Sequence, residues 1–286
     1  MAEVSKEYKD FTLRLSVGKN ENFEDLYIDF AQIGNLLLLG DSGTGKTNFM
    51  QNMLLSLGKN TSPEFCQIVV IDSSFDYDAF DGMKHISAVI SSPDAILECL
   101  KNVQEIIEDR YRIFSEANCR NIEAYNSKAK EKLPHIVICI DEFAPLMISH
   151  PKEICAVFER ICTMGRVPGV HLIIGTKEFM PEVFNATIRY LFKDFVAFNI
   201  SKPKCDVDYI KVYLDGIEPW KLERGEHILK IEDIAPVLLK EQYLTDEEIE
   251  KTVKSIKKET KSTGTNAIER LFHKLFDITN KDNKND

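Results

Sequence analysis

Eight consecutive residues, 40–47, have the types and spacing needed to bind the phosphates of a nucleotide. They read Gly-Asp-Ser-Gly-Thr-Gly-Lys-Thr and fit the pattern G-x-x-x-x-G-K-[ST]. Glycines let the backbone pass close to an anion with its N–H groups pointing inward. Lys46 has the length to reach the outer phosphates, and the Thr47 hydroxyl can ligate Mg²⁺. We predict a site for a nucleoside triphosphate with Mg²⁺, formed by Gly40, Asp41, Ser42, Gly43, Thr44, Gly45, Lys46, Thr47 and Asn48.

The sequence on either side of this loop is what a phosphate-binding loop requires. The four leucines at 36–39 predict a buried strand, and residues 48–58 predict a helix whose positive end faces the bound anion. The alternative interpretation is a chance glycine turn. The flanking strand and helix argue against that alternative, because a chance match has no reason to sit between them.

A second candidate element, around Asp141 and Glu142, supplies the groups that hydrolysis needs. Residues 136–140 are all apolar and predict a buried strand that ends at these two acids. Asp141 is expected to hold the water shell of Mg²⁺ beside Thr47, and Glu142 to polarise the attacking water. Ligands gather at the carboxyl ends of parallel strands, so both acids should meet the loop there. The alternative is an ordinary strand end with solvated acids.

Composition places limits on the class of protein. The 286 residues are 44% hydrophobic and 29% charged, which suits one large globular domain or two small ones. No apolar run approaches the ~20 residues of a membrane span, and the polar N-terminus is no secretory signal. Seven cysteines without a C-x-x-C pair favour reduced thiols in a cytoplasmic protein. The net charge of −10 argues against broad nonspecific binding to nucleic acid, although a local basic track remains compatible with it.

Apolar periodicity predicts an α/β fold with a mainly parallel central sheet flanked by helices. The tail, 258–286, is expected to hold a Ser/Thr/Gly linker, an amphipathic helix over 267–277 and a disordered end, whereas 1–257 form one ATPase domain. A small antiparallel addition is expected at 226–231 and 235–239. The expected strands are 26–28, 36–39, 67–72, 86–90, 136–140, 170–175 and 194–200, and the expected helices are 48–58, 94–117, 151–164 and 245–257.

The order of residues resembles the FtsK/SpoIIIE motor family. Residues 133–147, Leu-Pro-His-Ile-Val-Ile-Cys-Ile-Asp-Glu-Phe-Ala-Pro-Leu-Met, look like the segment of that family that carries its two acids. Residues 164–176 resemble its M-G-R-x-x-G-I-H-L-I-x-A-T segment, and 120–126 resemble its R-N-x-x-x-Y-N piece. The similarity continues in order from about residue 24 to 255, which makes it far more specific than either phosphate-site motif.

The resemblance implies a RecA-like motor that assembles as a hexamer and pumps double-stranded DNA with ATP as fuel. It also implies a site completed across the subunit interface, with Arg166 as a catalytic residue acting on the neighbour's ATP beside Glu142 and Lys46. The alternative for Arg166 is a surface cation after a helix. Thr176 and Lys177 align with the segment that senses the outer phosphate, and Arg189, Lys202 and Lys204 align on or beside positions that contact DNA.

The sequence departs from the family at two places. The family has Gln-Arg-Pro where this chain has Lys177-Glu178-Phe179, and a second family arginine falls at Val207. Because phosphate contacts add together, these losses weaken the grip on DNA without abolishing it. The family's membrane spans, winged helix and most of its N-terminal motor subdomain have no counterpart here, which favours a motor of a mobile-element, conjugation, packaging or segregation type.

Two other functions stay open at this point. One is a motor that handles protein, as type VII secretion ATPases do, which the acidic balance and Glu178 favour. The other is a nucleotide-gated assembly module that hydrolyses slowly. The helix at 267–277 is a candidate docking element for a recruiting protein partner, and packing on its own domain is the equal alternative.

Overall fold

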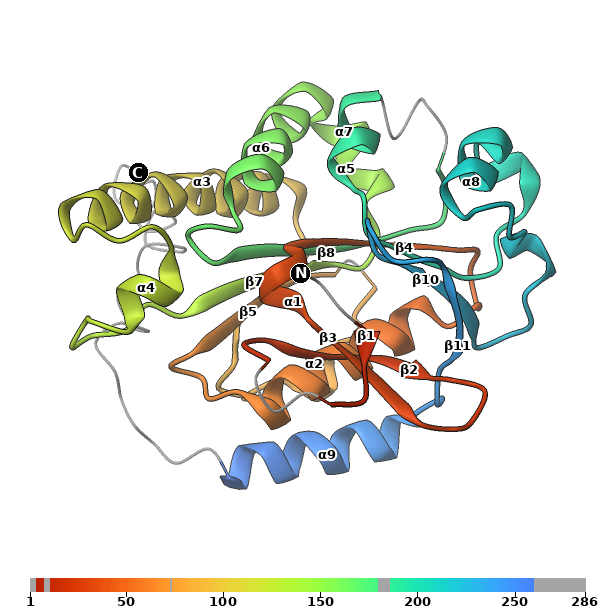
Figure 1. Cartoon of the computed structure of the whole chain (residues 1–286), viewed down its shortest axis with the longest axis horizontal. Coiled ribbons are helices and arrows are strands. Elements are labelled where there is room, and N and C mark those ends of the chain that lie inside the picture. Colours follow the sequence, from red (N-terminus) through yellow and green to blue (C-terminus); the bar gives the residue numbers. More distant parts are fainter. Residues whose placement is uncertain (1–3, 8–10, 73, 180–185, 260–286) are drawn as a thin grey trace, which may run out of the picture.

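A twisted sheet runs through the part of the chain that the structure, a computed structural model, describes, namely residues 4–7, 11–72, 74–179 and 186–259 (Figure 1). Within those ranges its eleven strands are ordered β1-β3-β2-β11-β10-β9-β4-β8-β7-β5-β6. The strands are β1 (Val4–Ser5), β2 (Arg14–Lys19), β3 (Asp25–Asp29), β4 (Asn35–Leu39), β5 (Cys66–Ile71), β6 (Ile86–Ile90), β7 (His135–Ile140), β8 (Val170–Thr176), β9 (Phe195–Ala197), β10 (Glu226–Lys230) and β11 (Val237–Lys240).

The half of the sheet from β9 to β6 is parallel throughout. Its central strands β5, β7 and β8 are buried at every position, which explains their continuous apolar sequences. The predicted α/β class is thereby confirmed, and the carboxyl ends of β4, β7 and β5 lie at one edge of the sheet.

The other half is antiparallel and larger than the sequence led us to expect. The predicted pair β10 and β11 is present, and β11 continues the sheet into β2, β3 and β1. The strand β2 was not predicted, although Leu15 and Val17 alternate along it, Leu13 directly precedes it, and all three are fully buried. That period of two indicates a strand with one buried face.

Helices cover both faces of the sheet (Figure 1). One face carries α3, α5, α6 and α7, with α3 and α5 both packed on α6, and the opposite face carries α2 and α9, which contact each other. The helices are α1 (Phe30–Ile33), α2 (Lys46–Asn60), α3 (Pro93–Glu116), α4 (Ile122–Asn126), α5 (Ala144–Ser149), α6 (Pro151–Met164), α7 (Ala186–Leu191), α8 (Val207–Tyr213) and α9 (Asp246–Glu259), with 3₁₀ turns η1 (Asp78–Phe80), η2 (Lys202–Lys204) and η3 (Pro219–Lys221).

The long helices agree with the predicted ranges, and local hydrogen bonds explain where they begin. At α9, Thr245 Oγ1 accepts from the Glu248 N–H, and the Glu248 carboxylate accepts from the Thr245 N–H, as in a capping box. The helices of four to seven residues, α1, α4, α5, α7 and α8, were not predicted, because one or two turns are too short to show a helical period.

Two further predictions concern the ends of the chain and the membrane. The helix predicted at 267–277 lies outside the described residues, so the division of the chain near 257 stays a prediction. Among the helices of the described ranges, none combines the length and the apolar character needed to cross a bilayer.

Candidate nucleotide-binding site

The predicted phosphate loop lies between the end of β4 and the start of α2. Gly43 and Gly45 have φ angles of 77° and 112°, a backbone conformation that side chains with a Cβ rarely adopt. At Gly40 a Cβ would lie 2.7 Å from the Cβ of Phe198, so a larger residue does not fit. The loop is fixed to its neighbour because the Asp41 N–H donates to the Asn199 carbonyl at 2.8 Å.

Lys46 folds back over this loop. Its ammonium donates to the carbonyl oxygens of Gly40 at 2.6 Å and Asp41 at 3.0 Å. The side chain is buried, and burial lowers the pKa of Lys46 to about 8, against the attraction of Glu142 and Asp141. The two carbonyls are neutral, so the ammonium would form a stronger hydrogen bond with an anion such as a phosphate.

Thr47 and Asp141 are in contact, as predicted from the order of the elements. Thr47 Oγ1 donates to Asp141 Oδ2 at 2.9 Å. Burial raises the pKa of Asp141 to about 6, and its Oδ1 atom is buried without a hydrogen-bond partner among the described residues. A buried carboxylate oxygen that lacks a donor is suited to a cation or its bound water.

Two acids that the sequence analysis missed lie beside Asp141. Asp72 and Asp76 each place a carboxylate oxygen within 4.8 Å of one from Asp141. Asp72 directly follows β5, the neighbour of β7, and its carboxylate accepts the N–H groups of Ser74 and Asp76. The acid at the end of the 67–72 run was visible in the sequence, and adjacency of the two strands is what connects it to the site.

Glu142 is engaged by Lys177. The Lys177 N–H donates to Glu142 Oε1 at 3.3 Å, and the Lys177 ammonium lies 3.2 Å from Glu142 Oε2. Thr176, the other residue of the predicted sensor, is fully buried and its hydroxyl donates to the Glu178 carbonyl. Of the two, Lys177 therefore faces the site, and Thr176 holds the turn that presents it.

These side chains surround one cavity of about 140 Å³. Its walls come from the start of α2, from the segments that follow β5, β6 and β7, and from the turn after β8. The residues that carry charge or a hydroxyl in it are Lys46, Thr47, Asp72, Ser74, Asp76, Ser91, Asp141, Glu142 and Lys177. The structure thus brings together every residue predicted for catalysis and metal binding except Arg166.

Arg166 lies at the opposite edge of the sheet. It precedes β8, it is exposed, and its guanidinium donates to the Gln32 carbonyl just before β4. The phosphate loop follows β4, and the five residues of that strand cover roughly 16 Å. Arg166 therefore does not reach the nucleotide cavity of its own chain. Beside it is a larger cavity of about 690 Å³, lined by residues that include Gln32, Thr163, Arg166, Lys193, Asp194 and Glu232.

Arg189 does not fit its predicted contact with DNA. Its side chain is 8% exposed, its guanidinium pairs with Asp206 at 2.7 Å, and it stacks against the rings of Phe179 and Tyr209. A cation already neutralised and packed between aromatic rings is not offered to a phosphate. The arginine holds α7 against the turn after β8 instead.

The two predicted lysines differ in their surroundings. Lys202 is exposed, with its ammonium 4.9 Å from the centre of the Trp220 ring, so it is available to an anion. Lys204 pairs with Asp41 of the phosphate loop at 3.2 Å. Asn48, predicted to touch nucleotide, exchanges two hydrogen bonds with the backbone of Leu244 on the far side of α2.

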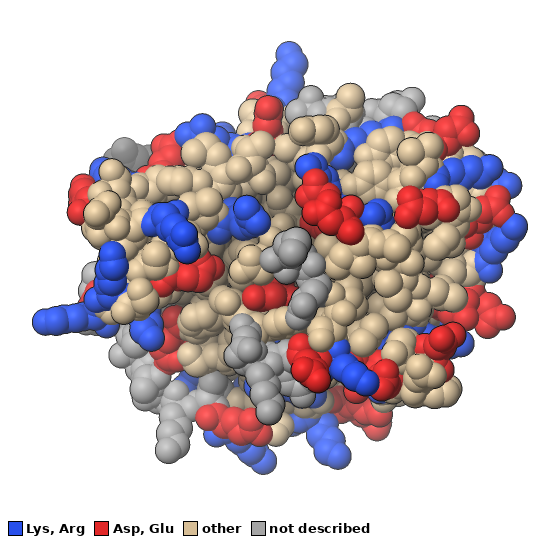
Figure 2. All heavy atoms as spheres, viewed as in Figure 1, with Lys and Arg blue, Asp and Glu red and all other residues tan. Residues whose placement is uncertain are grey.

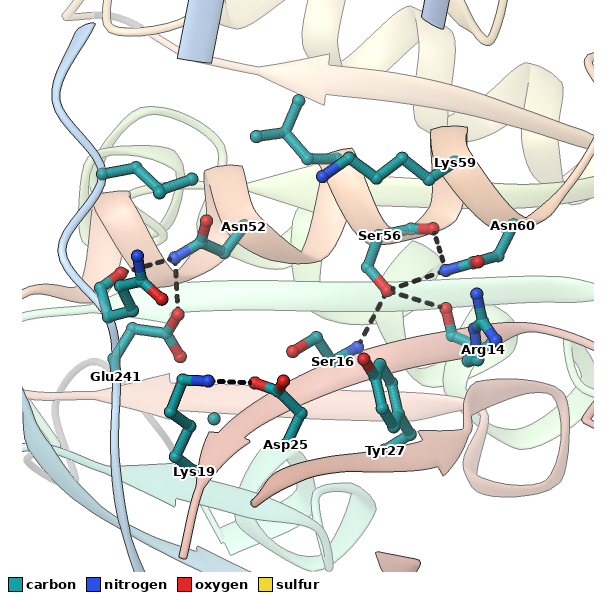
Figure 3. A pocket seen from close by; sticks show the side chains of 14 residues that line it. Arg14, Ser16, Lys19, Asp25, Tyr27, Asn52, Ser56, Lys59, Asn60 and Glu241 are labelled. Carbon is teal, nitrogen blue, oxygen red and sulfur yellow. Dashed lines mark hydrogen bonds and ion pairs between the residues drawn. The ribbon is translucent and has the colours of Figure 1, made fainter. Parts of the chain in front are cut away.

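A separate cavity of about 250 Å³ lies between β2, α2 and residues 241–244 (Figure 3). Figure 3 shows Glu241 under Asn52, which donates to its carboxyl, and the ion pair of Lys19 with Asp25. Burial raises the pKa of Glu241 to about 8. This cavity shares no lining residue with the nucleotide site.

Comparison with solved structures defines the class of protein. The fold matches a conjugation coupling protein, pCW3 TcpA in a monomer form with ATPγS, with a TM-score of 0.73 and 20% identity over 88% of this chain and 72% of that one. It also matches the cytoplasmic domain of the type VII secretion ATPase EccC of Thermomonospora curvata, with a TM-score of 0.70 and 20% identity over 86% of this chain and 31% of that one. The fold is that of a P-loop ATPase.

Sequence comparison identifies the family. The model of the FtsK/SpoIIIE family matches residues 2–181, and the chain belongs to that family. The DNA translocase FtsK of Campylobacter jejuni (serotype O:2) is 30% identical over 90% of this chain, and the DNA translocase SpoIIIE of Bacillus subtilis is 27% identical over 94%. The chain spans only 27% and 37% of the lengths of these two relatives.

Proposed function

We propose that this chain is the motor domain of an ATP-driven translocase that acts on double-stranded DNA. The observation that carries the proposal is the convergence of Lys46, Thr47, Asp141 and Glu142 on one cavity, in a chain of the FtsK/SpoIIIE family. Relatives of this family that match most of the chain are named DNA translocases.

The chemistry of the cavity fits ATP with Mg²⁺. Thr47 and Asp141 would hold the cation, because they offer a hydroxyl and a carboxylate oxygen side by side. The other carboxylate oxygen of Asp141 is buried and has no donor within the described part of the chain. Mg²⁺ neutralises charge on the phosphates when it is bound. Lys46 binds the outer phosphates from the loop side.

Glu142 acts on water in this proposal. Its carboxylate lies next to Asp141 at the end of β7 and faces the same cavity as Lys46. A carboxylate there accepts a hydrogen bond from water and orients the oxygen toward the outer phosphate. The attacking oxygen forms the new bond to phosphorus, ADP leaves, and the proton of the water passes toward Glu142.

Arg166 is proposed to complete the site of another copy of the chain. Arg166 lies at the opposite sheet edge, too far away to contact the nucleotide of its own chain. Its side chain is exposed and can contact a neighbouring subunit. A ring, with six subunits as the family resemblance implies, brings opposite edges of successive subunits together. We place this oligomer in the cytoplasm, where ATP and DNA are available.

The surface of the described residues suits a modest electrostatic grip. On the face shown in Figure 2, basic and acidic side chains are interspersed, with no broad patch of one sign. Lys202 is exposed, whereas Glu178, in the turn after β8, is an exposed acid that repels phosphate. Glu178 is also the observation that favours the second candidate, a motor acting on protein.

The test is the rate of ATP hydrolysis at low salt, with and without duplex DNA of ~50 base pairs, because phosphate contacts are strongest there. We expect a several-fold increase with DNA, and Glu142→Gln serves as the inactive control. If DNA leaves the rate of hydrolysis unchanged and a peptide from a secreted protein raises it, the second candidate, a motor acting on protein, is favoured. If the wild-type chain binds ATP but does not hydrolyse it, the remaining function is that of a nucleotide-gated assembly module.

A further inference from the structure

Lys177 makes two different contacts with the proposed catalytic glutamate. The backbone N–H of Lys177 donates to Glu142 Oε1, and the side-chain ammonium pairs with Oε2. While the ammonium stays on Oε2, a water molecule must compete with it for that oxygen.

The Lys177 ammonium also borders the space expected for the outer phosphate. It lines the same cavity as Lys46 and Glu142, and its charge acts on both Lys46 and Asp76. Lys46 approaches that space from the loop, and Lys177 approaches it from the turn after β8. The cavity therefore holds two ammonium groups that come from separate elements.

The backbone of this turn is fixed while the side chain is not. Thr176 Oγ1 donates to the Glu178 carbonyl, and the Phe179 N–H donates to the Lys204 carbonyl. The Lys177 side chain is 48% exposed and has a flexible four-carbon stem. Its ammonium can thus change partners without movement of the turn, while the N–H contact keeps Glu142 in place.

We propose that Lys177 exchanges the Glu142 carboxylate for the γ-phosphate when ATP arrives, and that this exchange releases Glu142 to act on water. The inference rests on the proposed function. ATP with Mg²⁺ keeps a surplus of roughly two negative charges, which Lys46 and Lys177 together offset. ADP lacks the γ-phosphate, so with ADP the ammonium stays on Glu142. The exchange makes release of the base depend on ATP.

Binding constants for ATPγS and ADP test the γ-phosphate contact. In Lys177→Met we expect ATPγS to bind about tenfold more weakly and ADP to change by less than about twofold, the effect of one lost charge-assisted contact. Lys177→Arg should keep the wild-type preference, since it keeps the charge. The matched control is Lys254→Met, which removes an exposed lysine from an ion pair with Glu250 on α9.

Equal weakening of both nucleotides in Lys177→Met, or no weakening of either, would overturn the inference while leaving the proposed function intact. A wild-type chain that binds neither nucleotide would overturn both. The Tm without nucleotide shows whether each variant is folded, and Lys177→Gln, which also removes the charge, is the second variant if Lys177→Met does not fold.

A double-mutant cycle tests the exchange itself. The Tm values of Lys177→Met, Glu142→Gln and the double variant should be non-additive without nucleotide, because the ion pair exists in that state. At saturating ATPγS the coupling between the two residues should disappear, because the ammonium has moved. Coupling of the same size in both states would show that Lys177 remains on Glu142 and would contradict the proposal.

Discussion

Lys46 and Glu142 divide the work of the proposed site, because one binds phosphate and the other acts on water. The Lys46 ammonium donates to two loop carbonyls. These acceptors are neutral, so a charged phosphate binds the ammonium more strongly than they do. Lys46→Ala should therefore abolish ATP binding, with the affinity falling by more than about 100-fold. Titration calorimetry measures the loss, and a Tm within a few degrees of the wild type shows that the variant is folded.

Glu142→Gln should separate binding from hydrolysis. The amide keeps the size of the carboxylate and can still accept the Lys177 N–H, but it is a poor base. We expect ATP to bind and the rate of hydrolysis to fall by about 10²–10⁴-fold. A steady-state assay with purified protein measures this, and normal turnover would sink the assignment of Glu142.

The sequence predicted those residues of the site that belong to a local motif within one segment. The loop 40–47 and the acids Asp141 and Glu142 carry local patterns, and the structure places them together. Contacts between segments left no such pattern. The pairing of Lys177 with Glu142 and the burial of Arg189 against Asp206 depend on neighbours that only the fold supplies.

At the scale of elements, β8 and β7 approach each other unusually closely at the nucleotide edge. A Cβ on Gly175 would lie 2.2 Å from the Asp141 carbonyl oxygen, so an alanine there must push the end of β7 away. Gly175→Ala should lower the free energy of unfolding by about 1–3 kcal/mol. It should also reduce hydrolysis, because it displaces Asp141 and Glu142. Denaturant unfolding and the ATPase rate measure the two effects.

The control is Ile174→Val, one residue away and equally buried, which removes a methylene group without crowding β7. It should cost about 1 kcal/mol of stability and leave hydrolysis intact. If Gly175→Ala were fully active at unchanged stability, the close approach of the two strands in solution would be refuted.

The segment after β11 fastens the helix that begins at the phosphate loop. Asn52 of α2 donates to the carboxyl of Glu241, whose pKa burial raises from its usual 4.5 to about 8 (Figure 3). Between pH 4.5 and about pH 8, the folded chain therefore holds a proton on Glu241 that the unfolded chain lacks. The stability that the protonated carboxyl contributes is complete below about pH 4.5 and is lost as the pH rises through 8.

Glu241→Gln should remove this dependence, because the amide stays neutral and still accepts from Asn52. We expect the Tm of the wild type to fall more between pH 6 and pH 9 than the Tm of the variant, by a few degrees. Thermal melts at both pH values measure the difference. Parallel curves for the two proteins would contradict the raised pKa of Glu241.

The elements themselves were predicted with uneven success. Long apolar runs such as 136–140 fixed the parallel strands, and the capping box located α9. Of the antiparallel strands β1 to β3, only β3 was predicted, at 26–28. The strand β1 has two residues, too few to show a period, and β2 joins the sheet through β11 from the other end of the chain. No local pattern encodes a pairing across that separation.

At the scale of the whole molecule, the position of Arg166 predicts shared sites. Arg166→Ala should abolish hydrolysis although its own nucleotide cavity is intact. Mixing it with Lys46→Ala should restore part of the activity, because one variant supplies the intact cavity and the other the arginine. The ATPase rate over a series of mixing ratios measures this. Normal hydrolysis by Arg166→Ala alone would remove the reason to propose sharing.

We propose that the chain moves along double-stranded DNA at the expense of ATP. Displacement of a third strand from duplex DNA tests it directly, because a motor that tracks the duplex strips a bound triplex-forming oligonucleotide from its path. We expect displacement that requires ATP, that stops with ATPγS, and that is absent in Glu142→Gln. DNA-bound protein that hydrolyses ATP and leaves the third strand in place would contradict the proposed translocation.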